Sequence, residues 1–163
     1  MYIIINIEKE GNNLKSSAEL EMNTENLDLS VPAFGYELIR DILIPDILGK
    51  ETSEILYWSG KHLARKFPLV SMDEIISFFE EAGWGSLHLI KEDKKGMELE
   101  LTSSIISRQF DLKTESCFKL EAGFIAEQIQ TQRKLRTEAY EEIIKRHRKI
   151  KLIVRWDVKD TDI

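Results

Sequence analysis

The sequence predicts an α+β domain in which helices pack over an antiparallel sheet. Three early stretches carry apolar residues at helical spacing: 34–43, 52–67 and 71–82. Two later stretches alternate apolar and polar residues, as strands with one buried face do: 86–102 and 149–156. Between them, residues 117–130 are apolar on more than one helical face, which is typical of a buried helix.

Composition indicates one globular domain, over residues 31–160, and argues against nucleic acid as a binding partner. The chain has 163 residues, of which 42% are hydrophobic and 32% charged, enough to bury a sizeable core. The formal net charge of −6 argues against nucleic-acid binding, because phosphate contacts require a basic surface. A single cysteine fits a reducing cytoplasm, and no apolar run is long enough for a membrane span. We therefore expect a cytoplasmic protein.

Residues 1–30 are expected to form a flexible N-terminal arm. From residue 8 onward the segment EKEGNNLKSSAELEMNTENLDLS is rich in Asn, Ser and Glu and has no sustained period. It offers too little apolar surface to offset the entropy lost on ordering. A minor alternative is that Met22 is the true start and that residues 1–21 come from an upstream start codon.

The first helix of the domain should carry Phe34, Leu38 and Ile42 along one apolar stripe. Pro45 has no N–H to bond the carbonyl of residue 41, so this helix should kink or end there. Gly49 can supply the left-handed residue of a helix stop.

A second helix is expected over 52–67, with Thr52 or Ser53 as its cap and Pro68 as its stop. Gly60 lies on its apolar face. Because an interior glycine costs about 1 kcal/mol relative to alanine, its presence suggests that a neighbouring backbone comes close.

The third helix has the clearest local signature. Ser71 and Glu74 have the spacing of a capping box, and Val70 and Ile75 the spacing of a hydrophobic staple. Gly83 should end this helix in the left-handed conformation.

A hairpin should follow, with strands at 86–92 and 97–104 joined by the turn 93–96. Leu87 and Leu89 should face the core on the first strand, while His88 faces water. Residues around 103–114 are expected to form a loop.

The helix over 117–130 should be buried on two sides, leaving Glu121 and Gln128 in a narrow exposed strip. Its Gly123 is best explained by close packing of a neighbouring element.

The C-terminal part has one clear strand and one ambiguous stretch. Residues 149–156 alternate well, but LRTEAYEEIIKR at 135–146 fits both a helix and a strand. Its Glu, Ala and Leu content alone favours a helix.

Five blocks together closely resemble the YslB-like proteins, a small bacterial family of unassigned function. They are YELIRDILIPDILG, YWSGKHLARKFP, FFEEAGWG, CFKLEAGFIAEQIQ and VRWDVKD, and the resemblance covers about residues 33–160. More distantly, the layout is similar to the 4-vinyl-reductase-type ligand-binding domain and to subunits of the TRAPP vesicle-tethering complex.

This resemblance implies a four-stranded antiparallel sheet built of two hairpins, with 137–145 as its third strand. It also implies homodimerisation through the first helices and, in some relatives, an apolar pocket for a ligand. It supports neither covalent lipid binding nor a metal cluster, because the cysteines that relatives use are missing here. We expect no cofactor and no metal.

The remaining chemical candidates are weak. Cys117 precedes a helix, where a thiol pKa can fall, but a buried packing role fits it better. His62 and His88 have no metal-ligand spacing. The basic run KRHRK at 145–149 fits a polar hairpin turn better than a recognition motif. No catalytic residue is assigned.

The most specific functional hypothesis concerns aromatic and glycine residues. We expect Trp58, Gly60, Trp84, Gly123 and Phe124 to border a ligand pocket or to serve helix packing. The sequence therefore predicts a non-enzymatic module that binds a small apolar ligand or a protein partner. The alternatives are an enzyme that uses Cys117 and a dimeric adaptor with a filled core.

Overall fold

A computed structural model describes residues 2–5, 20–23, 30–113 and 115–159. The chain divides into two units, 1–31 and 32–163. In the first unit, Tyr2–Ile5 (β1) pairs antiparallel with Leu20–Asn23 (β2). The flexible arm expected over 1–30 falls mainly outside the described residues.

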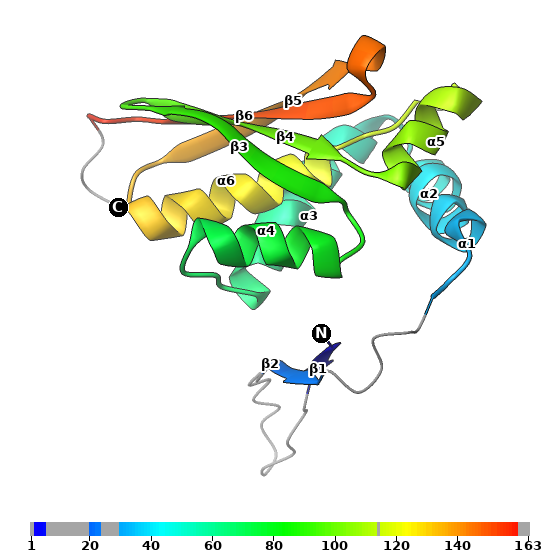
Figure 1. Ribbon diagram of the computed structural model, residues 1–163, viewed down its shortest axis with the longest axis horizontal. Coiled ribbons are helices and arrows are strands. Elements are labelled where there is room, and N and C mark those ends of the chain that lie inside the picture. The colour runs from blue at the N-terminus through cyan, green and yellow to red at the C-terminus, as the bar shows by residue number, and fades with distance from the viewer. Residues whose placement is uncertain (1, 6–19, 24–29, 114, 160–163) are drawn as a thin grey trace. The chain divides into compact units, whose positions relative to one another are not determined.

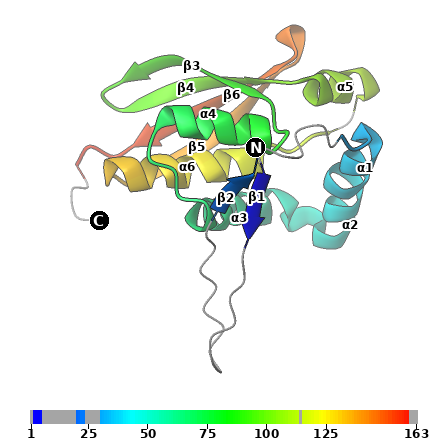
Figure 2. The ribbon, with the colours of Figure 1, turned by 60° about the horizontal axis from the view of Figure 1, so that its bottom comes forward.

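The second unit is an α+β fold with a four-stranded antiparallel sheet in the order β3-β4-β6-β5, which confirms the predicted class. Its strands are Ser86–Asp93 (β3), Gly96–Thr102 (β4), Thr137–Ile144 (β5) and Lys149–Trp156 (β6). Its α-helices are Ala33–Glu37 (α1), Ile44–Leu48 (α2), Thr52–Lys66 (α3), Met72–Glu81 (α4), Ser104–Leu112 (α5) and Lys119–Arg133 (α6). Figures 1 and 2 show α3, α4 and α6 gathered on one face of the sheet, with α5 at one end of it.

The two central strands give the sheet one apolar and one charged face. Met97, Leu99 and Leu101 of β4 are buried and pair with buried Val154, Leu152 and Ile150 of β6. Glu98 and Glu100, which alternate with them, form ion pairs with basic residues of β6. The period-2 pattern of the sequence thus decides which face the helices cover.

β5 is a strand, as the family resemblance implied and against its local helical propensity. It lies at the sheet edge and, among the described strands, pairs with β6 alone. Buried Ala139 lies opposite buried Val154, so tertiary pairing overrides a weak intrinsic preference.

The predicted hairpin is confirmed, with one correction. Leu89 was expected in the core but is 41% exposed. The β3–β4 register shifts between Leu89 and Lys91. Leu89 itself still pairs with buried Leu99, so its exposure is due to its place on the edge strand β3 and not to a change of register.

The loop expected over 103–114 was wrong, because it contains helix α5. Ser103 caps this helix by accepting the backbone N–H of Ile106 at 3.0 Å. Lys113 ends it in the left-handed conformation, φ +54°. The serine cap was a usable signal, but the helix has only nine residues and buries few of them.

Half of the predicted capping box of α4 is present: Ser71 Oγ accepts the N–H of Glu74 at 3.2 Å, but the Glu74 carboxylate accepts the N–H of Val70, at 2.9 Å, in place of that of Ser71. Gly83 follows the end of α4 and has φ +70°, the left-handed conformation that was expected. The hydrophobic staple was wrong: Ile75 is buried, whereas Val70 is 80% exposed.

The first helical segment does not end at Pro45 but runs on to Leu48. Leu38–Leu43 are π-helical, so that Ile44 N–H bonds the carbonyl of Ile39 just before the proline. A wider turn at this point accommodates the missing N–H of Pro45. Gly49 then stops the helix with φ +62°, as predicted.

The start of α3 also differs from expectation, because no side chain caps it and Glu51 is its N-cap residue. Its end is supported by Gln128, which was predicted to be wet but is 1% exposed. The Gln128 amide donates to the Phe67 carbonyl at 2.7 Å and accepts the Leu69 N–H at 3.1 Å. These bonds satisfy the backbone where Pro68 breaks the helix.

We expect Gly123→Ala to lower the free energy of unfolding by about 1–3 kcal/mol. A methyl group at 123 would lie 2.0 Å from the Tyr57 carbonyl oxygen, so the two helices would have to separate. Gly35→Ala is the matched control. Gly35 is also helical, nothing lies within 4 Å of an added methyl, and alanine there should be neutral or stabilising. Urea unfolding measures both, and equal effects would contradict the close approach.

Candidate functional site

Gly60 and Gly123, two of the five predicted site residues, lie where the backbones of α3 and α6 touch. A methyl at 60 would lie 2.1 Å from the Leu120 carbonyl oxygen, and one at 123 would lie 2.0 Å from that of Tyr57. The space beside each glycine is therefore filled by the facing helix.

Phe124 and Trp84 lie in an aromatic cluster under the sheet. Phe124 is fully buried and stacks on Phe78, with ring centroids 4.6 Å apart. Trp84 meets Phe124 edge-to-face at 5.4 Å, a favoured geometry for aromatic pairs. The cluster fills the core between α4 and α6.

Trp58 lies apart from this cluster. It is 56% exposed and lines an open groove along α3 with Ile55, Leu63 and Leu120. The five predicted residues are therefore not gathered around one cavity. Trp84 lines a second cavity, and Leu120 borders both.

That second cavity lies between the first helical segment and the α3–α6 pair. Its volume is about 210 Å³. The lining residues are Tyr36, Ile39, Arg40, Ile44, Leu56, Trp84 and Leu120. Apart from the Tyr36 hydroxyl, the Arg40 guanidinium and the Trp84 indole N–H, these side chains are apolar, so the cavity suits a small apolar group.

Arg40 is the charged group in that wall, and it forms an ion pair with Glu121 of α6. The distance from Arg40 Nη2 to Glu121 Oε1 is 2.5 Å, and the Glu121 side chain is only 2% exposed. The prediction that Glu121 faces water was therefore wrong. The guanidinium also donates to Tyr36 Oη at 2.8 Å and to the Cys117 carbonyl at 3.1 Å. Burial tends to lower the pKa of Arg40, but the nearby Glu121 carboxylate outweighs burial, and the pKa lies above its usual value.

Two further polar contacts hold the first helical segment to the body. Arg108 Nε donates to the Glu37 carboxylate at 2.6 Å, and the Gln109 amide donates to Asp41 Oδ2 at 3.0 Å. Glu37 is only 7% exposed. The segment thus turns its charged stripe inward.

Its apolar stripe faces outward, in the reverse of the usual arrangement for a helix on a globular protein. The exposed apolar residues are Phe34 (59%), Leu38 (42%), Ile39 (57%), Ile42 (49%), Leu43 (51%) and Ile47 (70%). We call these six residues the apolar face of 33–48.

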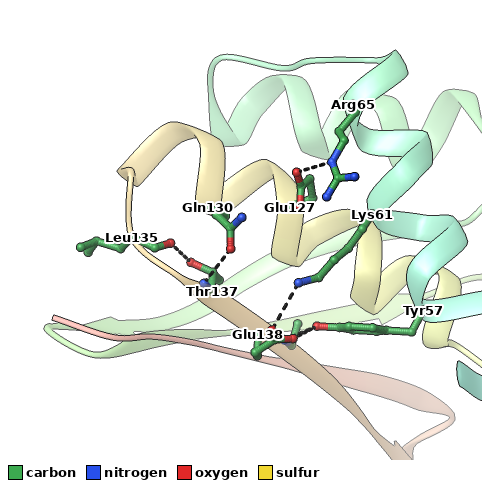
Figure 3. Close-up of polar contacts among 9 residues, drawn as sticks. Tyr57, Lys61, Arg65, Glu127, Gln130, Leu135, Thr137 and Glu138 are labelled. Atoms are coloured by element: carbon green, nitrogen blue, oxygen red, sulfur yellow. Dashed lines mark hydrogen bonds and ion pairs between the residues drawn. The ribbon is translucent and has the colours of Figure 1, made fainter. Parts of the chain in front are cut away.

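A polar cluster joins α3 to the edge strand β5 (Figure 3). Lys61 Nζ lies 3.3 Å from Glu138 Oε1, and the Tyr57 hydroxyl donates to the same carboxylate. The Tyr57 hydroxyl also accepts the Ala139 N–H at 3.2 Å, a backbone group on the free side of β5. Burial and the Glu138 carboxylate raise the pKa of Tyr57, so its hydroxyl stays protonated. This arrangement closes a sheet edge and is a structural connection.

Reactive and metal-binding groups are sparse. Cys117 is partly buried, and its Sγ lies 3.8 Å from Ser53 Oγ. Among the described residues, no group of three or more His, Cys, Asp and Glu side chains is placed to hold a metal ion. Within the same residues, no helix has the length and apolar character needed to cross a membrane.

Residues 33–155 match the protein family of unknown function DUF2507. The chain is also 49% identical over 144 residues to the uncharacterized protein YslB of Bacillus subtilis strain 168, covering 88% of this chain and 97% of that one. The chain belongs to the DUF2507 family. The resemblance to YslB-like proteins drawn from the five sequence blocks is thereby confirmed.

The fold of this DUF2507 member is similar to that of a solved vinyl-4-reductase family protein from Methanocaldococcus jannaschii. The TM-score is 0.57 at 17% identity, with 79% of this chain and 83% of the other covered. This likeness confirms the predicted fold relationship.

The sequence did not reveal the Arg40–Glu121 pair or the Tyr57–Lys61–Glu138 cluster. A usable signal was present for Arg40: together with Glu37, Asp41 and Ile44 it forms a stripe at helical spacing opposite the apolar one. The pattern shows two faces of the helix, but not which face is covered.

We expect Arg40→Met to lower the free energy of unfolding by about 3–5 kcal/mol, because it leaves the Glu121 carboxylate buried without its partner. The double variant Arg40→Met/Glu121→Met removes both charges and should be more stable than the single variant. Asp111→Asn breaks an ion pair whose side chains are 52% and 58% exposed, and it should change stability little. Thermal unfolding compares the three. A double variant less stable than Arg40→Met would contradict this assignment.

Proposed function

We propose that this DUF2507 protein is a non-enzymatic cytosolic interaction module that assembles as a homodimer through the apolar face of 33–48. One observation carries the proposal: the first helical segment presents its charges to the body and its large apolar side chains to solvent. Six such side chains within fourteen residues form a continuous patch of the kind that marks interaction surfaces.

The inward contacts show that this orientation is specified rather than incidental. Arg40–Glu121, Arg108–Glu37 and Gln109–Asp41 each connect the segment to a different part of α5 or α6. Rotating the segment to bury its apolar stripe would break all three connections and leave Glu121 buried without its partner. The apolar face therefore stays available for a partner.

A second copy of the chain fits this face better than a charged partner does. The patch itself carries no charge, whereas the chain as a whole carries −6, so two copies meet with least repulsion where charges are absent. A contact between identical patches closes with two-fold symmetry and does not propagate. The family resemblance, which implies dimerisation through the first helices, supports the same choice.

Ile42→Asp should convert the dimer into a folded monomer, because it places a charge in the centre of the apolar face. Ile42 is already 49% exposed, so the fold should survive. Val70→Asp is the matched control, since Val70 is 80% exposed and lies outside the patch. Sedimentation velocity reports the mass, and circular dichroism reports the fold. A wild-type chain that stays monomeric at micromolar concentration, or an Ile42→Asp variant that stays dimeric, would refute the proposal.

The cavity of about 210 Å³ supports a second candidate function, binding of a small apolar ligand. Its wall includes Trp84, one of the residues expected to border a pocket, and Ile39 of the apolar face. Native mass spectrometry of protein from its own host should then show a small adduct on the dimer. Loss of that adduct in Leu56→Phe, which fills the cavity, would support this candidate, whereas an adduct retained in that variant would count against it.

The alternative of an enzyme acting through Cys117 receives no geometric support. Within the described part of the chain, the only hydrogen-bonding contact of its thiol is Ser53 Oγ, which is not a general base.

A further inference from the structure

The open groove along α3 is a second exposed apolar surface, and we call it the α3 groove. Its volume is about 660 Å³, and apart from Leu120 of α6 its described lining comes from residues 51–66. Ile55 and Trp58, in the middle of this stretch, are 40% and 56% exposed. An aromatic side chain held in such a position is typical of interaction surfaces, because a partner that covers it buries a large apolar area.

One stripe of residues runs along the α3 groove from end to end. It consists of Glu51, Ile55, Trp58, His62 and Lys66, all of which line the groove and all of which are exposed. These residues recur every three or four positions, so they lie along one side of the helix. The stripe therefore has an acidic end, an apolar and aromatic middle, and a basic end.

The charges at the two ends of the stripe are available to a partner. Glu51 and Lys66 take part in none of the ion pairs formed among the described residues. Two other basic residues of the same helix, Lys61 and Arg65, pair instead with acids of β5 and α6 (Figure 3). The fold thus employs the charges beside the stripe internally and leaves those of the stripe itself for another chain.

The stripe is complementary to a second copy of itself. Its midpoint lies between Trp58 and Ser59, equally far from Glu51 and Lys66. A two-fold axis through this midpoint makes the two copies of α3 antiparallel. Glu51 of each copy then lies opposite Lys66 of the other, and the two Trp58 side chains meet near the axis. Opposite charges attract in this antiparallel arrangement, whereas a parallel one would place like charges together.

The α3 groove is also connected to the apolar face of 33–48. The cavity of about 210 Å³ is lined by Ile39, which belongs to that face, and by Leu120, which also lines the groove. One contact between two copies can therefore cover both surfaces. The apolar face carries no charge that could fix the direction of a partner, and the stripe of α3 supplies such charges, since charge patterns determine register more than affinity.

We propose that the α3 grooves of two copies pack against each other, antiparallel about a two-fold axis near Trp58, within the dimer formed by the apolar face of 33–48. This inference rests on the proposed function and specifies how the two copies meet. Glu51–Lys66 contacts at both ends of the stripe fix the direction of the helices, and Trp58 is covered in the dimer.

Acrylamide quenching of tryptophan fluorescence in the full chain tests where the copies touch. Trp84 and Trp156 are 9% and 6% exposed, so Trp58 is the tryptophan that the quencher reaches. We expect quenching to be about twofold weaker in the wild-type dimer than in the Ile42→Asp monomer, because the partner excludes solvent from Trp58. Trp58→Phe should remove this difference. Equal quenching in a wild-type dimer and in the monomer would overturn the inference and leave the proposed function standing, with the α3 groove open to a different protein.

Charge reversal tests the antiparallel direction. Glu51→Lys and Lys66→Glu should each raise the Kd of the dimer about tenfold, because a symmetric dimer then contains two like-charge contacts. The double variant Glu51→Lys/Lys66→Glu places opposite charges across the axis again, so its Kd should return to within about threefold of the wild-type value. Glu80→Lys and Lys94→Glu make the same changes at exposed positions outside the groove lining and should leave the Kd unchanged. Sedimentation equilibrium gives the Kd, and circular dichroism confirms that each variant is folded.

The possible failures are distinguishable. Single reversals that leave the Kd of a wild-type dimer unchanged would overturn the α3 contact alone. A double variant that is weaker than either single variant would overturn the antiparallel direction, because it would show that Glu51 and Lys66 do not face each other. A wild-type chain that stays monomeric would overturn both this inference and the proposed function.

Discussion

The contact between α3 and α6 at Gly60 and Gly123 is the constraint on which the rest of the structure depends. Because neither glycine has a side chain, each backbone reaches the other directly. That proximity brings Tyr57 within reach of the edge strand β5, sets Phe124 beneath α4, and lets Gln128 bond the backbone where α3 ends. A wider spacing would break all three arrangements together, so the helix pair organises the sheet edge and the core alike.

The first helical segment is attached to this centre in a different way. Its connections are ionic and polar, with Arg40–Glu121 the most buried, and they hold the charged stripe inward. A segment attached through apolar packing would have no free apolar face. Because charged contacts hold the segment, its apolar face is left uncovered. The Arg40–Glu121 pair that positions the segment therefore also keeps the proposed dimer surface exposed.

Most elements could be predicted from local pattern, since caps, glycine stops and period-2 alternation act over a few residues. The sequence could not show which element packs against each face of a helix or pairs with each strand. The inward turn of Glu121 depends on Arg40, eighty-one positions away. Strand β5 depends on pairing with β6 and required the family resemblance. Helix α5 was missed although Ser103 caps it, because it has nine residues and buries just two of them, Ile106 and Gln109. The two glycines were recognised as packing positions, but a pattern cannot tell a filled contact from a pocket wall, and the structure gathers the five expected residues around no single cavity.

Native-state hydrogen exchange tests the central role of the helix pair most directly. If α3 and α6 form the rigid centre, the amides around Gly60 and Gly123 should exchange only through global unfolding, with the free energy that urea unfolding gives. Amides of α1 and of Leu38–Leu43 should open at lower free energy, because that segment leaves most of its large apolar side chains exposed. Exchange around Gly60 and Gly123 that is as fast as in α1 would contradict the account.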